Sequence, residues 1–313
     1  MNYKNFKRIV TVKIKDYLPE QYKDSDLIFK SISKINQDLD GICLNMGANQ
    51  LSPTIYINNM YEEFLCCNDL QKTLKNAVAT LVNASRNTKP FSLNIDMIKR
   101  NITYMFINTE RNKELLKNIP HRDFLDLSVI YTVIVSGLDD KEDCIGKITI
   151  TNDIMNTFGL NEQKLFNMAA TNAPRIFPLN VEDMQDVMNK IYEDVMNNSD
   201  KCSVEDLCSM TDIIENTSSG YPKMLVVSNQ KRINGAIAIM YKGVLDTIAD
   251  IFNSDIYIMP SSIHEVIVVS TNDFDASFAS EISIINENAV QDNEILSDNM
   301  YLYNRKTRQI SIV

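Results

Sequence analysis

The chain has two histidines, His121 and His264, and histidine is the side chain that most readily exchanges a proton near neutral pH. His264 follows Ser262 by two residues in the segment MPSSIHEVIVVS. If this segment is extended, the Ser262 hydroxyl and the His264 ring project to the same side. The spacing is therefore compatible with a serine-type hydrolase, in which Ser262 is the nucleophile, His264 the base, and Asp123 or Asp298 the orienting carboxylate.

A structural interpretation of the same segment competes with the catalytic one. The sequence contains no GxSxG turn, and no glycine-rich loop nearby would form an oxyanion hole. Serine is a common turn residue, so Ser261 and Ser262 are expected to close a tight turn while His264 makes a satisfied hydrogen bond at a sheet end. The pattern favours this structural role, and the hydrolase is kept as the alternative.

A second polar cluster, His121, Arg122 and Asp123, lies in NIPHRDFLDL. These residues could form an anion-binding corner, but a structural ion pair at the same place is favoured. A metal site would need His121, His264, Glu265 and Asp123 together. The chain lacks closely spaced ligand pairs such as HExxH, so we predict no metal. A P-loop, a GxGxxG fingerprint and an EF-hand are also missing, so no cofactor is predicted.

The overall charge bears on the choice of partner. The chain carries 41 acidic and 31 basic residues, a net charge of −10, which opposes extensive contact with phosphates and favours basic partners. Nucleic acid is therefore disfavoured, and a basic protein surface is favoured. The sequence contains no run of about 20 apolar residues, which a membrane-spanning helix would need. The lysine-interrupted N-terminus does not resemble a secretion signal, and the six cysteines include no CxxC pair, so we expect a cytoplasmic protein with reduced thiols.

Hydrophobic periodicity predicts the elements that position these residues. Helices are expected at 3–18, 59–67, 70–84, 113–119, 180–195, 244–252 and 275–288, together with two short helices within 151–174. Strands are expected at 27–35, 41–46, 102–108, 125–136, 144–150, 224–228 and 236–240, and in hairpins at 255–270 and around 304–307. Asn161 and Asn180 are predicted N-caps, with Thr151 or Asn152 as a third, and Pro174 is a predicted helix stop.

Short connections between neighbouring strands predict an α+β fold, with an antiparallel or mixed β-sheet and helices packed on it. We expect two subdomains, residues 1–119 and 120–313. The break at Pro90 is a candidate hinge, and the second subdomain contains a polar insert at about 197–222.

Six segments carry a resemblance to a known family. They are PTIYIN, NKELLKNIPHRDFLDL, KITITNDIMNTFGLNEQKLFNMAATNAPRIFP, NQKRINGAIAIMYKGVL, SDIYIMPSSIHEVIVV and LSDNMYLYNR. Over nearly its whole length the chain resembles the bacterial domain-of-unknown-function family 5688, and from Ile148 through MPSSIHEV it also resembles family 1444. The resemblance implies a bacterial, clostridial-type protein found among genes of mobile elements, and it transfers no catalytic residue.

Together these observations favour a non-enzymatic cytoplasmic binding or regulatory module, an accessory protein of a mobile element. The alternative is a hydrolase that uses Ser262 and His264. For this alternative we expect the two residues to meet an acidic partner in an open cleft.

Overall fold

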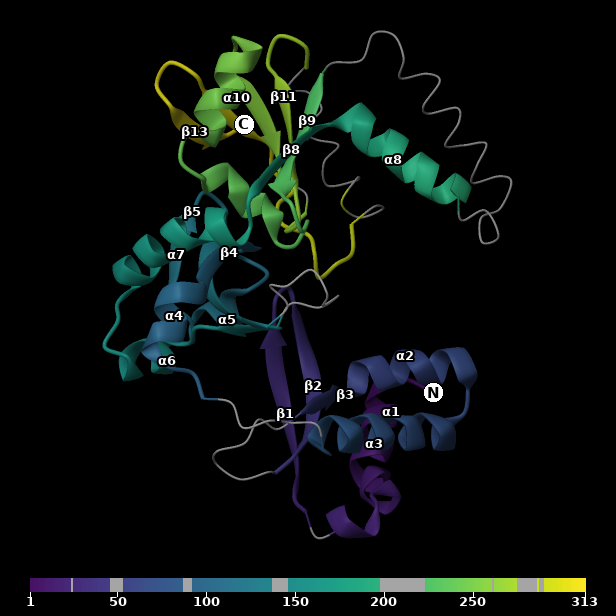
Figure 1. The fold of residues 1–313 in the computed structure, drawn as a ribbon. Helices are drawn as coiled ribbons and strands as arrows, with labels where there is room; N and C mark the ends of the chain where they lie inside the picture. The colour runs from purple at the N-terminus through teal and green to yellow at the C-terminus, as the bar shows by residue number, and fades with distance from the viewer. Residues whose placement is uncertain are drawn as a thin grey trace. The chain divides into compact units, whose positions relative to one another are not determined.

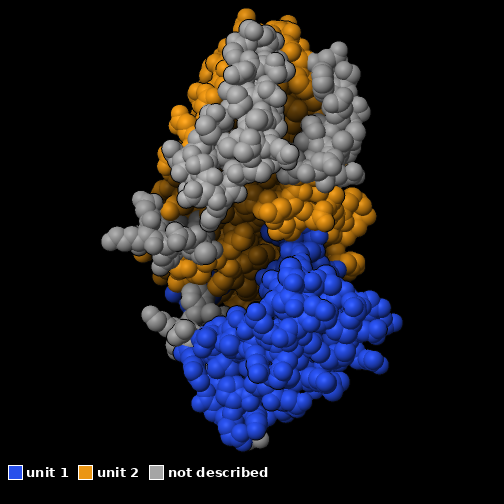
Figure 2. Space-filling view, turned by 90° about the vertical axis from the view of Figure 1, so that its right-hand side faces the viewer, with its two compact units in different colours: residues 1–94 blue, residues 95–313 orange. Residues whose placement is uncertain are grey.

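The chain divides between Asn94 and Ile95 into two units, which Figure 2 colours blue and orange. The computed structural model describes residues 1–23, 25–45, 53–86, 92–136, 146–197, 223–260, 262–274, 286 and 290–313. The boundary predicted at 119/120 falls within the second unit, because strand β4 (Ile102–Asn108) pairs along its whole length with strand β6 (Leu127–Ser136). Pro90 and residues 198–222 of the predicted insert lie outside the described residues.

In the first unit, helices pack on a three-stranded antiparallel sheet with the order β1-β2-β3 (Figure 1). The elements are α1 (Tyr3–Lys13), η1 (Ile14–Tyr17), η2 (Glu20–Tyr22), β1 (Leu27–Lys34), β2 (Gln37–Leu44), β3 (Thr54–Tyr56), α2 (Ile57–Cys67) and α3 (Leu70–Arg86). Phe6, Ile42, Leu74 and Leu81 are fully buried in its core. The turn between β1 and β2 is tighter than predicted, because Asn36 adopts a φ of 59°, a left-handed conformation that asparagine tolerates.

The second unit begins with a four-stranded antiparallel sheet in which β6 is the central strand. Its elements are α4 (Ile95–Asn101), β4, α5 (Lys113–Leu116), β5 (His121–Phe124), β6 and β7 (Gly146–Thr149). Most of β4 and β6 is buried, which agrees with their nearly continuous apolar sequences. Strand β5 was not predicted, because its sequence HRDF contains only one apolar residue.

A six-stranded antiparallel sheet follows, with the order β13-β12-β10-β11-β9-β8. Its strands are β8 (Leu179–Asp183), β9 (Met224–Asn229), β10 (Ile256–Met259), β11 (Val266–Ser270), β12 (Tyr301–Asn304) and β13 (Gln309–Ile312). The other described helices of the second unit are α6 (Asn152–Thr157), α7 (Glu162–Ile176), α8 (Met184–Asn197), η4 (Gly235–Met240) and α10 (Val244–Phe252). Figure 1 shows α10 beside this sheet and α7 beside β4 of the preceding sheet. The α+β prediction is confirmed.

Three local predictions for the second unit need correction. Residues 236–240 form the 3-10 helix η4 rather than a strand. Asn180 is not a helix cap, because it lies in β8, and α8 begins only at Met184. Pro174 lies inside α7, which ends at Ile176. The caps predicted at Thr151 and Asn161 are confirmed, since each side chain accepts a hydrogen bond from the backbone N–H three residues later.

Two further predictions are compared with the structure only over the residues that it describes. The helix expected at 275–288 lies outside the described residues, apart from Asn286. Among the helices that are described, none combines the length and apolar character needed to cross a bilayer.

Candidate functional site

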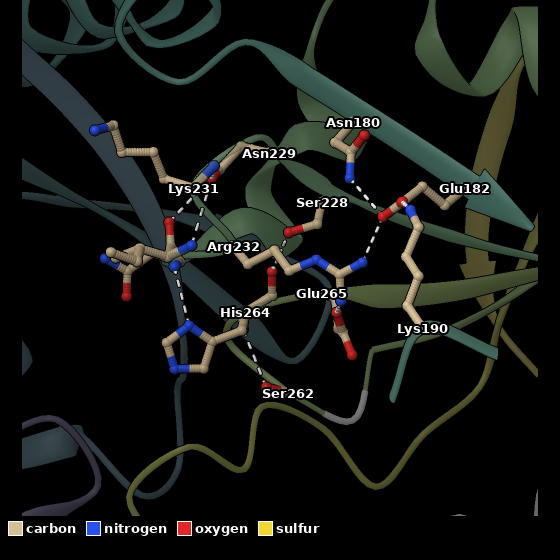
Figure 3. Close-up of polar contacts among 12 residues, drawn as sticks. Asn180, Glu182, Lys190, Ser228, Asn229, Lys231, Arg232, Ser262, His264 and Glu265 are labelled. Carbon is tan, nitrogen blue, oxygen red and sulfur yellow. Dashed lines mark hydrogen bonds and ion pairs between the residues drawn. The ribbon is translucent and has the colours of Figure 1, made fainter. Parts of the chain in front are cut away.

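Ser262 and His264 come together, but through the backbone rather than through the imidazole ring (Figure 3). The His264 backbone N–H donates to Ser262 Oγ at 3.1 Å. The ring has other partners: the Asn234 backbone N–H donates to His264 Nδ1 at 3.2 Å, and Nε2 lies 3.4 Å from Glu294 Oε1. A ring that accepts at Nδ1 carries its proton on Nε2, which faces Glu294. Both nitrogens are therefore in use.

This arrangement differs from that of a catalytic triad. A triad base keeps one nitrogen free to take the proton of the serine hydroxyl while a carboxylate holds the other. Here no such nitrogen remains on His264. Asp298, the candidate orienting carboxylate, accepts at Oδ1 from Asn286 Nδ2 at 2.7 Å. Through these contacts His264 joins the loop after β9 to Glu294.

The loop after β9 is built by local hydrogen bonds to Asn229. Asn229 Oδ1 accepts from the backbone N–H of Lys231 at 3.0 Å, and Asn229 Nδ2 donates to the Ile233 carbonyl at 2.8 Å (Figure 3). Arg232 and Asn234 both adopt a φ of 50°, which is uncommon for residues other than glycine. The loop thereby holds the Asn234 N–H against the His264 ring.

Gly235 follows this loop and packs too closely for a side chain. A Cβ atom there would lie 2.1 Å from Ser228 Oγ and 2.5 Å from the His264 carbonyl oxygen. Ser228 Oγ in turn donates to that carbonyl at 2.7 Å. The turn that contains His264 is therefore hydrogen-bonded to β9 and closely packed against Gly235, the first residue of η4.

A charged cluster centred on Glu182 lies beside this loop (Figure 3). Its carboxylate accepts from Lys190 of α8, from Arg232 and, at 2.8 Å, from Asn180 Nδ2. The Arg232 guanidinium also lies 4.0 Å from Glu265. The hydrogen bond from Lys190, with those from Asn180 and Arg232, lowers the pKa of Glu182 to about 2.

The depressed pKa of Glu182 predicts a pH-dependent contribution to stability. Its favourable contacts should be fully present above the ordinary glutamate pKa and should disappear as the pH falls from about 4.5 to about 2. We expect Glu182→Gln to lower the free energy of unfolding by about 1–2 kcal/mol at pH 7 and by much less near pH 2.5. Urea titrations at the two pH values measure this difference. An equal loss at both would show that the charge of Glu182 contributes nothing.

Arg122 forms an ion pair, as predicted, but its partner is Glu162 at the start of α7. Arg122 Nε and Nη2 donate to the two carboxylate oxygens at 3.0 and 2.9 Å, and the guanidinium lies 3.8 Å from the centre of the Phe166 ring. The buried Tyr131 hydroxyl donates to the same carboxylate. Partial burial raises the pKa of Glu162, but the hydrogen bonds from Arg122 and Tyr131 outweigh it, so the net pKa lies below the ordinary value.

The neighbours of Arg122 do not join this ion pair. His121 is exposed, and its Nδ1 contacts the Ile119 carbonyl at 3.1 Å. Asp123 is also exposed, because alternate residues of β5 face opposite sides. An anion-binding corner made by these three residues is therefore not assembled, since the guanidinium already faces a carboxylate.

In the described parts of the chain, no cluster of three or more His, Cys, Asp or Glu side chains could hold a metal ion. Cys66 and Cys67 are exposed free thiols near the end of α2, and Cys43 is a buried free thiol.

The fold defines an α+β protein with antiparallel sheets, in which the described contacts of Arg122, Ser262 and His264 are to other groups of the same chain. The sequence matches a family of unknown function, DUF5688, over residues 3–305, and the chain belongs to that family. The resemblance to family 5688 noted from the sequence motifs is thereby confirmed. Comparisons with curated proteins and with solved structures found no match.

Proposed function

We propose that the protein is a non-enzymatic binding module whose partner presents a basic protein surface. The observation that carries this proposal is the pairing of His264: both ring nitrogens are committed to Asn234 and Glu294. Ser262 Oγ accepts from the chain itself, and Asp298 contacts Asn286. The side chains best suited to acid–base chemistry therefore form hydrogen bonds or ion pairs within the chain. This supports binding over catalysis.

The choice of a basic partner rests on how the charge divides between the two units. Residues 95–313 contain 32 acidic and 19 basic residues, a net charge of −13, whereas residues 1–94 contain 9 acidic and 12 basic residues, a net charge of +3. A surplus of negative charge attracts positively charged partners over long range and repels nucleic acid. We therefore propose the second unit as the part that meets the partner.

The resemblance to the family also suggests where this protein acts and which genes accompany it. We propose a cytoplasmic accessory protein of a bacterial mobile element. Fractionation of cells that express a tagged full-length chain at native level would test the location, and recovery from the membrane or culture medium would contradict it.

The partner class is testable with a synthetic peptide of alternating lysine and serine, with a glutamate–serine peptide as the matched control. We expect the full-length chain to bind the lysine peptide only, with a Kd that rises about tenfold or more between 50 and 300 mM NaCl. Hydrogen exchange should show protection confined to residues 95–313. No binding at 50 mM NaCl, or protection confined to residues 1–94, would overturn the proposal.

One contact favours the hydrolase as a second candidate, because Ser262 and His264 do lie within hydrogen-bond distance of each other at the backbone. A fluorophosphonate probe discriminates between the two functions. We expect no labelling that depends on Ser262 or His264, because the ring cannot accept the proton of the hydroxyl. Labelling of the wild type that disappears in both Ser262→Ala and His264→Gln would establish the hydrolase instead.

A further inference from the structure

The first unit contains a pocket that plays no part in the proposed function. The pocket lies between strand β3 and the helices α2 and α3, and has a volume of about 270 Å³. Figure 1 shows these three elements side by side. This volume is close to the lower end of the range for small-ligand pockets.

The pocket combines an apolar floor with a polar rim. Met60 and Ala77 are buried and form part of the floor, next to the half-buried Tyr56. The rim includes Glu63 of α2 and Asn76 of α3. Such a lining suits a ligand that has an apolar body and a single polar end.

Glu63 determines the charge of that polar end. Asn76 Nδ2 donates to Glu63 Oε1 at 2.6 Å, and Oε2 accepts from no group in the described part of the chain. Within the described chain no Lys, Arg or His forms an ion pair with Glu63, although several other surface carboxylates have such a partner. A carboxylate that is held in place and lacks a cation will favour a positively charged ligand and will repel an anion.

We propose that this pocket binds a primary alkylammonium group, with the alkyl chain over Met60 and Ala77 and the ammonium at Glu63. Two sources share this chemistry: a free linear diamine and the side chain of a lysine. The lysine could be delivered by an extended peptide, because β3 is an edge strand and pairs only with β2 among the described residues.

The Met60 methyl group is a reporter at the pocket floor. In the full-length chain labelled with ¹³C at methionine methyls, the Met60 signal is assigned with Met60→Leu. We expect n-butylammonium to shift this signal saturably and uncharged butan-1-ol to shift it weakly. Glu63→Gln should raise the Kd for n-butylammonium about tenfold or more, because the charge-assisted contact is lost. Glu62→Gln is the matched control, since Glu62 is exposed and outside the pocket, and its Kd should stay within about twofold of wild type.

The other methionine signals report whether the Glu63→Gln variant is folded. If it is not, Thr80→Phe replaces it as the test, because Thr80 is an exposed rim residue whose enlargement should block the pocket and abolish the shift. Tighter binding of 1,5-diaminopentane than of a Val-Lys-Val peptide would identify a free diamine as the ligand, and the reverse order would identify a lysine side chain. Equal binding of butanol and n-butylammonium, or an unchanged Kd in both variants, would overturn the inference.

Discussion

Replacing Asp126 with alanine is expected to lower the free energy of unfolding of the second unit by about 3–4 kcal/mol. Asp126 lies in the turn between β5 and β6, and its Oδ2 accepts from Ser297 Oγ at 2.6 Å and from Asn299 Nδ2 at 3.0 Å. Its Oδ1 accepts from the Tyr301 hydroxyl. Ser297 and Tyr301 are fully buried, so the substitution leaves two hydroxyl donors without a partner.

The same contact joins the two sheets of the second unit. Tyr301 belongs to β12 of the six-stranded sheet, whereas Asp126 belongs to the hairpin of the four-stranded sheet. Asn108 Nδ2, at the end of β4, donates to the Leu296 carbonyl at 2.9 Å and reinforces the junction. Burial, together with the hydrogen bond to Asp126, raises the pKa of Tyr301, so this hydroxyl stays protonated as a donor over the physiological range.

Asp123→Ala is the matched control for Asp126→Ala. Asp123 lies three residues earlier in the same hairpin, is exposed, and should change the free energy of unfolding by no more than about 0.5 kcal/mol. Urea unfolding followed by circular dichroism measures both variants. If the two lost the same small amount, the Asp126 contacts would not stabilise the junction between the sheets.

The second large effect is expected at Glu162, where alanine should lower the free energy of unfolding by about 2–3 kcal/mol. The substitution removes the two-oxygen contact with Arg122 and leaves the Tyr131 hydroxyl, on a fully buried side chain, without its acceptor. Arg122→Ala should cost less, because Glu162 is only partly buried and keeps its contact with Tyr131.

A double-mutant cycle of Arg122→Ala and Glu162→Ala isolates the interaction between the two side chains, and we expect a coupling energy of about 1–2 kcal/mol. Asp153→Ala controls for the position of Glu162 at a helix start. Both acids lie in the first turn of a helix, but Asp153 is exposed and forms no ion pair with any residue that the structure describes, so its removal should cost about 0.5 kcal/mol. A coupling energy near zero would mean that the ion pair adds nothing beyond the contact with Tyr131.

The elements that were predicted correctly are those whose signal is local. The apolar run of β4 and the apolar face of α10 were located residue for residue, because periodicity depends only on neighbours in the chain. The Asn161 cap was found for the same reason. The prediction placed the start of α8 too early, at Asn180. In the sequence, an asparagine before an apolar stripe looks the same whether it caps a helix or lies in an edge strand.

The candidate site shows what local patterns miss. The proximity of Ser262 and His264 follows from their spacing of two residues, but the partners of the His264 ring, Asn234 and Glu294, come from 30 residues on either side. The sequence did not identify Asp126, Glu162 and Glu182, whose carboxylates each accept several hydrogen bonds. A carboxylate in a turn, at a helix start or in an edge strand is usually solvated, so its sequence context does not distinguish it from its exposed neighbours.

By itself, the sequence determined the α+β class, most helices and strands, and membership of the DUF5688 family, because each depends on patterns that run along the chain. Only the tertiary structure decided which polar groups are paired. The hydroxyl of Tyr301 meets Asp126 at a separation of 175 residues, and Arg122 meets Glu162 at a separation of 40. Hydrogen bonds act over about 3 Å, so their partners are selected by the order of strands in the sheets and the packing of α7.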